Sequence, residues 1–142
     1  MKLTKKDLIF ETKHWQVFLT TDQKYIGRGY VSLKREAGSL SELTQEEVID
    51  FFELVKKFES ALKQVFDATM FNWTCLMNNA YKEKPYNPHV HFHVRPRYDK
   101  EVEFAGEIFA DPNFAEHYKR GIMNKVSDEV RKQIIDKIKD NI

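Results

Sequence analysis

One short run constrains this chain more than any other segment: from His89 to Val94, histidine and apolar residues alternate without a break. Successive side chains of a β-strand point to opposite faces of a sheet. The run therefore predicts a strand that carries His89, His91 and His93 on one face and three apolar side chains on the other. A slip of one residue would bury three imidazoles, so the pattern also defines the register of pairing.

A long amphipathic helix is predicted to cover the apolar face of this strand. It runs from about Gln45 to Phe66, where apolar residues recur at alternating steps of three and four and so form one stripe. Thr44 is the expected N-cap, and Glu47 has the spacing of a capping box. The stripe consists of Val48, Phe51, Val55, Phe58, Leu62 and Val65.

Further strands and a second helix complete the predicted architecture. The runs 15–20 and 29–34 form a strand pair, and the run 70–78 is an antiparallel partner of the histidine strand. A closing helix begins near Ser127 and extends to about residue 141. We expect an α+β fold in a single domain, with about five antiparallel strands, one long helix packed on them and the C-terminal helix.

Two segments are harder to assign from their patterns. Residues 8–10 are apolar and form a short helix or an arm, and the segment 101–124 shows only one turn signal, Asp111-Pro112-Asn113. The closing helix is expected to bury Val130, Ile134, Ile138 and Ile142.

Charge limits the partners that such a domain can have. The 142 residues carry a formal net charge of +1, which argues against a broad basic face for long DNA or RNA and leaves a small anionic ligand open. The stretch 82–97 nevertheless has a local excess of positive charge. It contains Lys82, Lys84, Arg95 and Arg97 against the single acid Glu83.

The expected location is cytoplasmic, with no membrane partner. No export signal or long apolar span is recognisable in the sequence. Cys75 is the single cysteine, so an internal disulfide and a multi-cysteine metal site are excluded.

Three explanations of the histidine face are open. The histidines are polar filler on a half-exposed strand, or two of them bind a metal with a further donor such as His14 or His117. All three cannot share one ion, because they span roughly 13 Å along a straight strand. The third explanation, which the regular spacing favours, is phosphate chemistry. A neutral imidazole attacks phosphorus and later leaves, while neighbouring imidazoles bind phosphate oxygens or donate a proton.

The segment Pro88–Arg97, with the sequence PHVHFHVRPR, resembles the signature of the histidine-triad (HIT) family. Its closing Pro-Arg pair is similar to that of the dinucleoside polyphosphate hydrolase branch. Asn78 lies where many relatives carry a nucleotide-contacting asparagine. The runs 27–35 and 39–44 are similar to the family's second strand and to the entry into its long helix, so the resemblance covers about residues 14–98.

This resemblance implies a nucleotide hydrolase or nucleotidyl transferase. His91 would attack the α-phosphorus of a dinucleoside polyphosphate or a nucleoside phosphoramidate, and a covalent nucleotidyl-histidine would form. His93 would assist the leaving group, His89 would orient the site, and Asn78 would hold the phosphate or ribose. The family also implies a homodimer, a purine nucleotide, and no metal or cofactor for the covalent step. The alternative is a purine-nucleotide-binding protein with little catalysis.

Several positions depart from the family pattern. Arg28 stands where relatives often carry a histidine; it either binds phosphate, which we favour, or is a surface residue. The stretch 33–36 lacks the histidine of zinc-bearing relatives, so structural zinc is not expected. Residues 84–88 replace a Gly-Gln-Ser/Thr stretch that contacts phosphate in relatives. The sequence therefore does not define the chemical identity of the leaving group.

For the other candidate residues, packing or solvation is the preferred interpretation. Core positions are expected for Trp15, Phe18, Trp73 and Met77, and also for Cys75, which should be unreactive. Surface positions are expected for His14, His117, Lys82 and Lys84.

Overall fold

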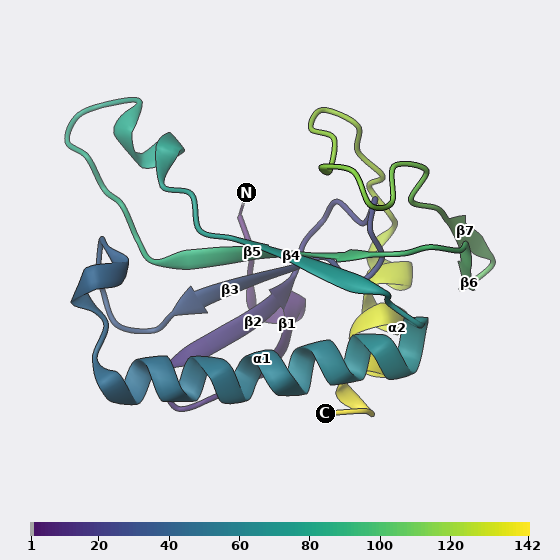
Figure 1. Ribbon diagram of the computed structural model, residues 1–142, viewed down its shortest axis with the longest axis horizontal. Coiled ribbons are helices and arrows are strands. Elements are labelled where there is room, and N and C mark those ends of the chain that lie inside the picture. The colour runs from purple at the N-terminus through teal and green to yellow at the C-terminus, as the bar shows by residue number, and fades with distance from the viewer. Residues whose placement is uncertain (1) are drawn as a thin grey trace.

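The protein has an α+β fold built on one five-stranded antiparallel sheet, as the computed structural model of residues 2–142 shows (Figure 1). In spatial order the strands are β1 (Leu8–Glu11), β2 (Trp15–Leu19), β3 (Gly29–Leu33), β5 (His91–Arg97) and β4 (Met70–Thr74). The histidine strand β5 therefore lies between β3 and β4, which both hydrogen-bond to it and hold its register. The predicted fold class is confirmed.

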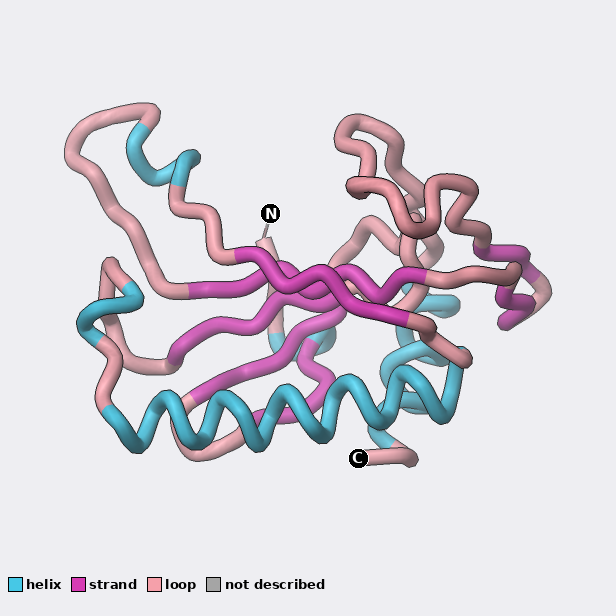
Figure 2. Tube along the Cα trace, in the orientation of Figure 1, coloured by secondary structure: helices cyan, strands magenta, loops and turns pink. Residues whose placement is uncertain are grey.

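Helix α1 (Gln45–Phe66) crosses one face of this sheet (Figure 2), with the bounds and the cap that its sequence predicts. The Thr44 hydroxyl accepts a hydrogen bond from the Glu47 amide at 3.2 Å, and the Glu47 carboxylate accepts one from the Thr44 amide at 2.8 Å. Val48 is 37% exposed, which corrects its predicted place in the stripe. The stripe continues back through Glu47 instead, because the cap and Arg35 bury that carboxylate.

The apolar face of β5 packs under α1, as the alternation predicts. Val90 and Val94 are fully buried, and the Phe92 ring lies 4.6 Å from that of Phe51 on the helix. The ladder begins at His91 rather than at His89, and β4 ends at Thr74 rather than at residue 78. Residues 75–90 form a loop that includes the short 3-10 helix η3 (Asn78–Tyr81).

The N-terminal segment is a strand, which corrects the expected helix or arm. A 3-10 turn, η1 (Lys5–Asp7), leads into β1, which pairs with β2 at the sheet edge. Three apolar residues are too few to show an alternating pattern. Strand β1 is therefore recognised only from its pairing with β2 in the structure.

The C-terminal helix α2 (Asp128–Lys139) packs against β1 and the end of α1. The Ser127 hydroxyl caps it by accepting a hydrogen bond from the Val130 amide at 3.2 Å. Ile134 and Ile138 are fully buried as predicted, whereas Ile142 is exposed because the helix ends before it. Neither helix within residues 2–142 combines the length and the apolar character needed to cross a bilayer.

The open face of the sheet lies opposite α1 and is flanked by two loops (Figure 2). One is the loop 75–90 before β5. The other is the stretch 110–126, which follows a small hairpin of β6 (Val102–Phe104) and β7 (Glu107–Phe109). A further 3-10 helix, η2 (Leu40–Glu42), precedes α1. The face of β5 that carries the histidines thus lies between these two loops.

Candidate active site

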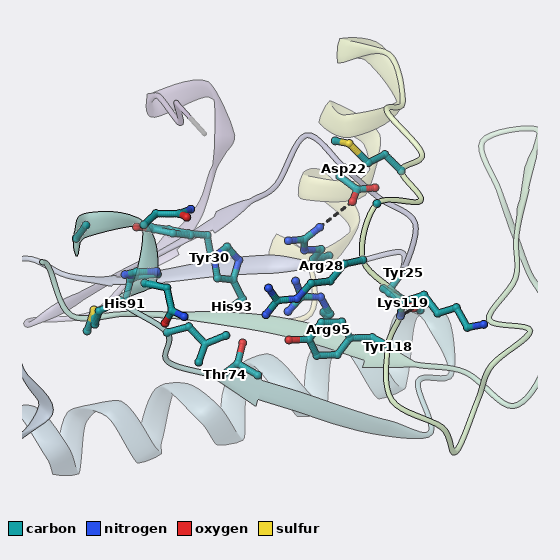
Figure 3. Close-up of a pocket in the computed structure, with 18 of the residues that line it drawn as sticks. Asp22, Tyr25, Arg28, Tyr30, Thr74, His91, His93, Arg95, Tyr118 and Lys119 are labelled. Carbon is teal, nitrogen blue, oxygen red and sulfur yellow. Dashed lines mark hydrogen bonds and ion pairs between the residues drawn. The ribbon is translucent and has the colours of Figure 1, made fainter. Parts of the chain in front are cut away.

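A cavity of about 590 Å³ opens on this face, and residues of both flanking loops line it (Figure 3). His89, His91 and His93 all line the cavity, so the structure brings the three predicted imidazoles together. The volume lies within the range of small-molecule sites.

His91 is held by a hydrogen bond that defines its tautomer. Its Nδ1 donates to the carbonyl oxygen of His89 at 2.7 Å. A carbonyl can only accept, so the neutral ring carries its proton on Nδ1 and a lone pair on Nε2. The Tyr30 ring stacks on the imidazole, with centroids 5.0 Å apart and an interplanar angle of 17°. An imidazole with an unprotonated Nε2 is the form that attacks phosphorus.

His89 holds the carbonyl that orients His91. Its own Nε2 donates to the Leu33 carbonyl at 2.8 Å, and the next amide, that of Val90, donates to the Ala37 carbonyl at 2.8 Å. These two bonds fasten the start of the histidine run to the last residue of β3 and to the loop that follows it. The His89 side chain therefore contributes to the site by positioning its own backbone.

His93 stands edge-on to both Tyr30 and His91, with ring centroids 5.3 and 5.4 Å apart. Burial, reinforced by the charges of Arg28 and Arg95, lowers the pKa of His93 to about 3. Its Nδ1 is buried and finds no hydrogen-bond partner among residues 2–142. In the free protein His93 is therefore neutral near pH 7.

Arg28 enters the cavity from the start of β3, next to a glycine that the backbone requires. Gly27 has a φ of +89°, and a Cβ there would lie 2.5 Å from the Leu62 side chain. Nη1 of Arg28 donates to the Asp22 carboxylate at 2.7 Å, and both residues line the cavity. Asn78 is exposed on the opposite rim, at the first residue of η3.

Arg97 does not belong to the cationic side of the site, which corrects the sequence interpretation. It is 1% exposed, and the Asp111 carboxylate accepts hydrogen bonds from its Nε at 2.6 Å and its Nη2 at 3.0 Å. The Asn72 side chain and the carbonyls of Asn113 and Glu116 accept its other hydrogens. The guanidinium is fully compensated inside the protein and binds the segment that follows β7.

Residues 111–124, called the strap below, form one side of the cavity through residues 118–123, and the sequence interpretation missed them. Arg97 holds the start of the strap, and the Asp22 carboxylate holds its end by accepting a hydrogen bond from the Asn124 amide at 2.9 Å. Between these points Tyr118, Lys119 and Arg120 line the cavity. The strap shows no hydrophobic period, and the adjacent basic residues Lys119 and Arg120 are the signal in its sequence that could have indicated an anion site.

The positive charge of the cavity comes only in part from the expected residues: Arg28 and Arg95 line it, as expected, whereas Arg97 does not. Lys82 and Lys84 are exposed in the loop before β5, as predicted for solvated residues, and they do not line the cavity. The cationic side chains that line it are Arg28, Arg95, Lys119 and Arg120.

One of the four aromatic and apolar candidates, Phe18, lies outside the predicted core. Trp15 is fully buried as predicted, and Trp73 is half-buried, with its Nε1 donating to the Glu59 carboxylate at 2.8 Å. Phe18 lies on the open face beside Tyr30, because the buried face of β2 is formed by Trp15, Val17 and Leu19. Met77 packs on the core from past the end of β4 and also lines the cavity.

The remaining candidates lie outside the cavity. Cys75 is half-buried past the end of β4, where burial raises the pKa of its thiol and so disfavours the thiolate. His117 is exposed as predicted, and His14 is half-buried near Glu46. Within the part of the chain that the structure describes, no three His, Cys, Asp or Glu side chains are grouped to hold a metal ion.

Comparison with known proteins establishes the family. The model of the HIT domain matches residues 2–100. An uncharacterized HIT-like protein of Methanocaldococcus jannaschii is 31% identical over 104 residues, which cover 71% of this chain and 78% of that protein. The chain belongs to the HIT family.

Solved structures share the whole fold. A histidine triad protein from Sinorhizobium meliloti has a TM-score of 0.72 at 18% identity, and the match covers 97% of this chain and 92% of that one. The Plasmodium falciparum diadenosine triphosphate hydrolase, solved in complex with cyclomarin A, has a TM-score of 0.64 at 18% identity, with coverage of 97% and 77%.

The pKa of His93 leads to a prediction for its titration. We expect its imidazole NMR signals to stay constant from about pH 8 to about pH 4.5 in the free protein, and a His93→Asn variant to identify them. Between the unfolded pKa of about 6.5 and the folded value of about 3 the unfolded chain binds more protons. This group therefore lowers stability as the pH falls through that window, and His93→Asn should lessen the loss. A midpoint near pH 6.5 in the free protein would contradict the assignment.

Proposed function

We propose that this protein is a nucleotide hydrolase or nucleotidyl transferase that acts at an α-phosphate through a covalent nucleotidyl-histidine on His91. The observation that carries the proposal is the hydrogen bond from His91 to the His89 carbonyl, which leaves an unprotonated Nε2 on a ring that lines a nucleotide-sized cavity. The stacked Tyr30 ring holds the plane of the nucleophile.

The proposed reaction has two steps. Nε2 of His91 donates its lone pair to the α-phosphorus, the bond from phosphorus to the leaving group breaks, and the leaving atom takes a proton from His93. Water then attacks the same phosphorus and gives a proton to His93, while the bond from phosphorus to His91 breaks. Both histidines return to their starting forms, and a second acceptor in place of water completes a transfer.

The proton on His93 arrives with the substrate in this scheme. The free ring is neutral, because burial and the neighbouring arginines disfavour its charged form. A bound phosphate brings negative charge to the same place and raises the pKa of His93. Arg28 and Asn78, from opposite sides of the cavity, hold the phosphate or ribose.

The proposed substrates are purine nucleotides whose α-phosphate carries a phosphate or amine leaving group. The fold shared with a diadenosine triphosphate hydrolase supports the phosphate-linked class. The test is incubation with diadenosine triphosphate, diadenosine tetraphosphate and adenosine phosphoramidate, with an alkaline quench and intact-protein mass analysis. We expect AMP release and a transient adduct of one AMP. Tight nucleotide binding without adduct or turnover would identify a binding protein with little catalysis.

We also propose a homodimer that uses α1 and the edge strand β4. Ile49 and Phe52 on α1 are 58% and 59% exposed. The Phe52 ring contacts that of Phe51, which contacts Trp73 of β4, each pair with centroids 5.7 Å apart. The exposed apolar surface thus adjoins an edge of the sheet, and a second copy would cover both.

The dimer proposal predicts that Phe52→Glu yields a monomer, because a carboxylate cannot be buried unpaired in an apolar interface. Size-exclusion chromatography with light scattering measures the mass of each variant. Lys57→Glu, an exposed charge reversal on the same helix, is the matched control and should remain dimeric. A monomeric wild type, or a dimeric Phe52→Glu variant, would contradict the proposal.

A further inference from the structure

The strap end of the cavity carries more positive charge than the protein itself compensates. Four cationic side chains line the cavity against the single carboxylate of Asp22. That carboxylate is already engaged, since it accepts hydrogen bonds from Arg28 and from the amides of Lys24 and Asn124. An excess of this kind favours an anionic ligand.

Arg95 and Arg97 show the difference between a compensated and an uncompensated arginine. They lie two residues apart on the same face of β5, and every N–H of the Arg97 guanidinium has an acceptor. Arg95 takes part in no ion pair within residues 2–142, and its Nη1 is buried without a hydrogen-bond partner. Its guanidinium lies over the Tyr118 ring, 3.8 Å from the centroid. The fold thus orients Arg95 without neutralising it.

Two neighbours of Arg95 also have buried polar atoms that lack a hydrogen-bond acceptor or donor among residues 2–142. Nε of Arg28 and Nδ1 of His93 are also buried, with no hydrogen-bond partner in the described part of the chain, and both residues line the cavity. Burial, reinforced by the charge of Arg28, lowers the pKa of Arg95 to about 10, which shows that its charge is disfavoured in the free protein. Buried polar groups without partners are uncommon in native proteins, and a phosphate would supply both acceptor oxygens and countercharge here.

We propose that Arg95, with Arg28 and Arg120, forms a second anion site beside the histidine face, and that the ligand of this protein carries a second phosphate there. The inference rests on the proposed function, because it takes the histidine face as the place of the reacting phosphate. Two residues along a strand span about 6.7 Å, so Arg95 lies one step beyond His93. A ligand with one phosphate, such as a nucleoside phosphoramidate, leaves this end unfilled.

The second phosphate belongs either to a polyphosphate chain or to a ribose hydroxyl, and calorimetric titration distinguishes these sources. The ligands are AMP, ADP and adenosine 3′,5′-bisphosphate. We expect at least one two-phosphate ligand to bind the wild type about tenfold or more tightly than AMP, the effect of a charge-assisted contact. In Arg95→Gln this ratio should fall close to one. A gain for ADP identifies a chain phosphate, and a gain for the bisphosphate identifies a ribose phosphate.

Two controls separate binding from folding. Lys84→Gln removes an exposed charge outside the cavity and should keep the tenfold gain. In urea unfolding Arg95→Gln should lose far less stability than Arg97→Gln, because the Arg95 guanidinium donates to no acceptor among residues 2–142. The proposal is overturned by equal affinities for all three ligands, by no binding at all, by a gain that survives in Arg95→Gln, or by equal destabilisation in the two variants.

The outcome is independent of catalysis. A protein that gains affinity through Arg95 and forms no nucleotidyl-histidine would uphold the second anion site and refute the catalytic proposal. A protein that forms the adduct and binds two-phosphate ligands no more tightly than AMP would uphold the catalytic proposal and refute the second anion site.

Discussion

Alanine in place of His91 is expected to lower turnover of a diadenosine polyphosphate by roughly 10⁴-fold or more, because the variant has no nucleophile for the covalent step. The AMP adduct should disappear from the mass spectrum of the quenched protein. KM should change little, since Arg28 and Asn78 still line the cavity. Steady-state AMP release measures kcat and KM, and the mass spectrum measures the adduct independently.

Two matched variants test whether the loss belongs to the nucleophile. His14→Ala removes a histidine near Glu46, outside the cavity, and should keep wild-type turnover. His89→Ala keeps the backbone carbonyl that accepts from His91 but loses its bond to Leu33, so we expect a smaller loss, roughly 10–100-fold. Turnover by His91→Ala within tenfold of the wild type would exclude His91 as the nucleophile.

The histidine strand and the long helix were predictable because each carries a complete local pattern. Six alternating residues defined which side of β5 faces the cavity, and the cap at Thr44 together with the apolar period defined α1 from Gln45 to Phe66. Even in α1, the apolar period predicts that Val48 is buried, which is wrong. Val48 is exposed and its neighbour Glu47 is buried, where it accepts a hydrogen bond from Arg35, a contact that the helical pattern does not contain.

The strap and the distribution of charge were not predictable in the same way. Arg95 and Arg97 look alike in the sequence, which predicts that both belong to one cationic patch. Their roles diverge because Asp111 lies against Arg97 after the chain has passed through the β6–β7 hairpin. The sequence shows that a charge is present, and only the fold shows whether it is neutralised.

The ion pair of Arg97 and Asp111 is expected to be the most sensitive polar contact in the fold. Arg97→Gln should lower the free energy of unfolding by about 3–5 kcal/mol, because it leaves the Asp111 carboxylate buried without a countercharge. Since domains of this size are stable by only about 5–15 kcal/mol, the urea midpoint should fall markedly. A midpoint equal to that of the wild type would show that the buried pair contributes nothing.

A double variant separates the buried charge from the lost contacts. Arg97→Gln combined with Asp111→Asn removes both charges and keeps an oxygen that accepts from the Tyr98 amide, so part of the stability should return. The strap should nevertheless stay loose, because the shorter glutamine side chain cannot replace the bonds that the guanidinium makes to the carbonyls of Asn113 and Glu116. Tyr118 would then no longer hold Arg95 in place, and the folded double variant should lose the added affinity for a second phosphate. Full recovery of that affinity would mean that the strap is held without Arg97.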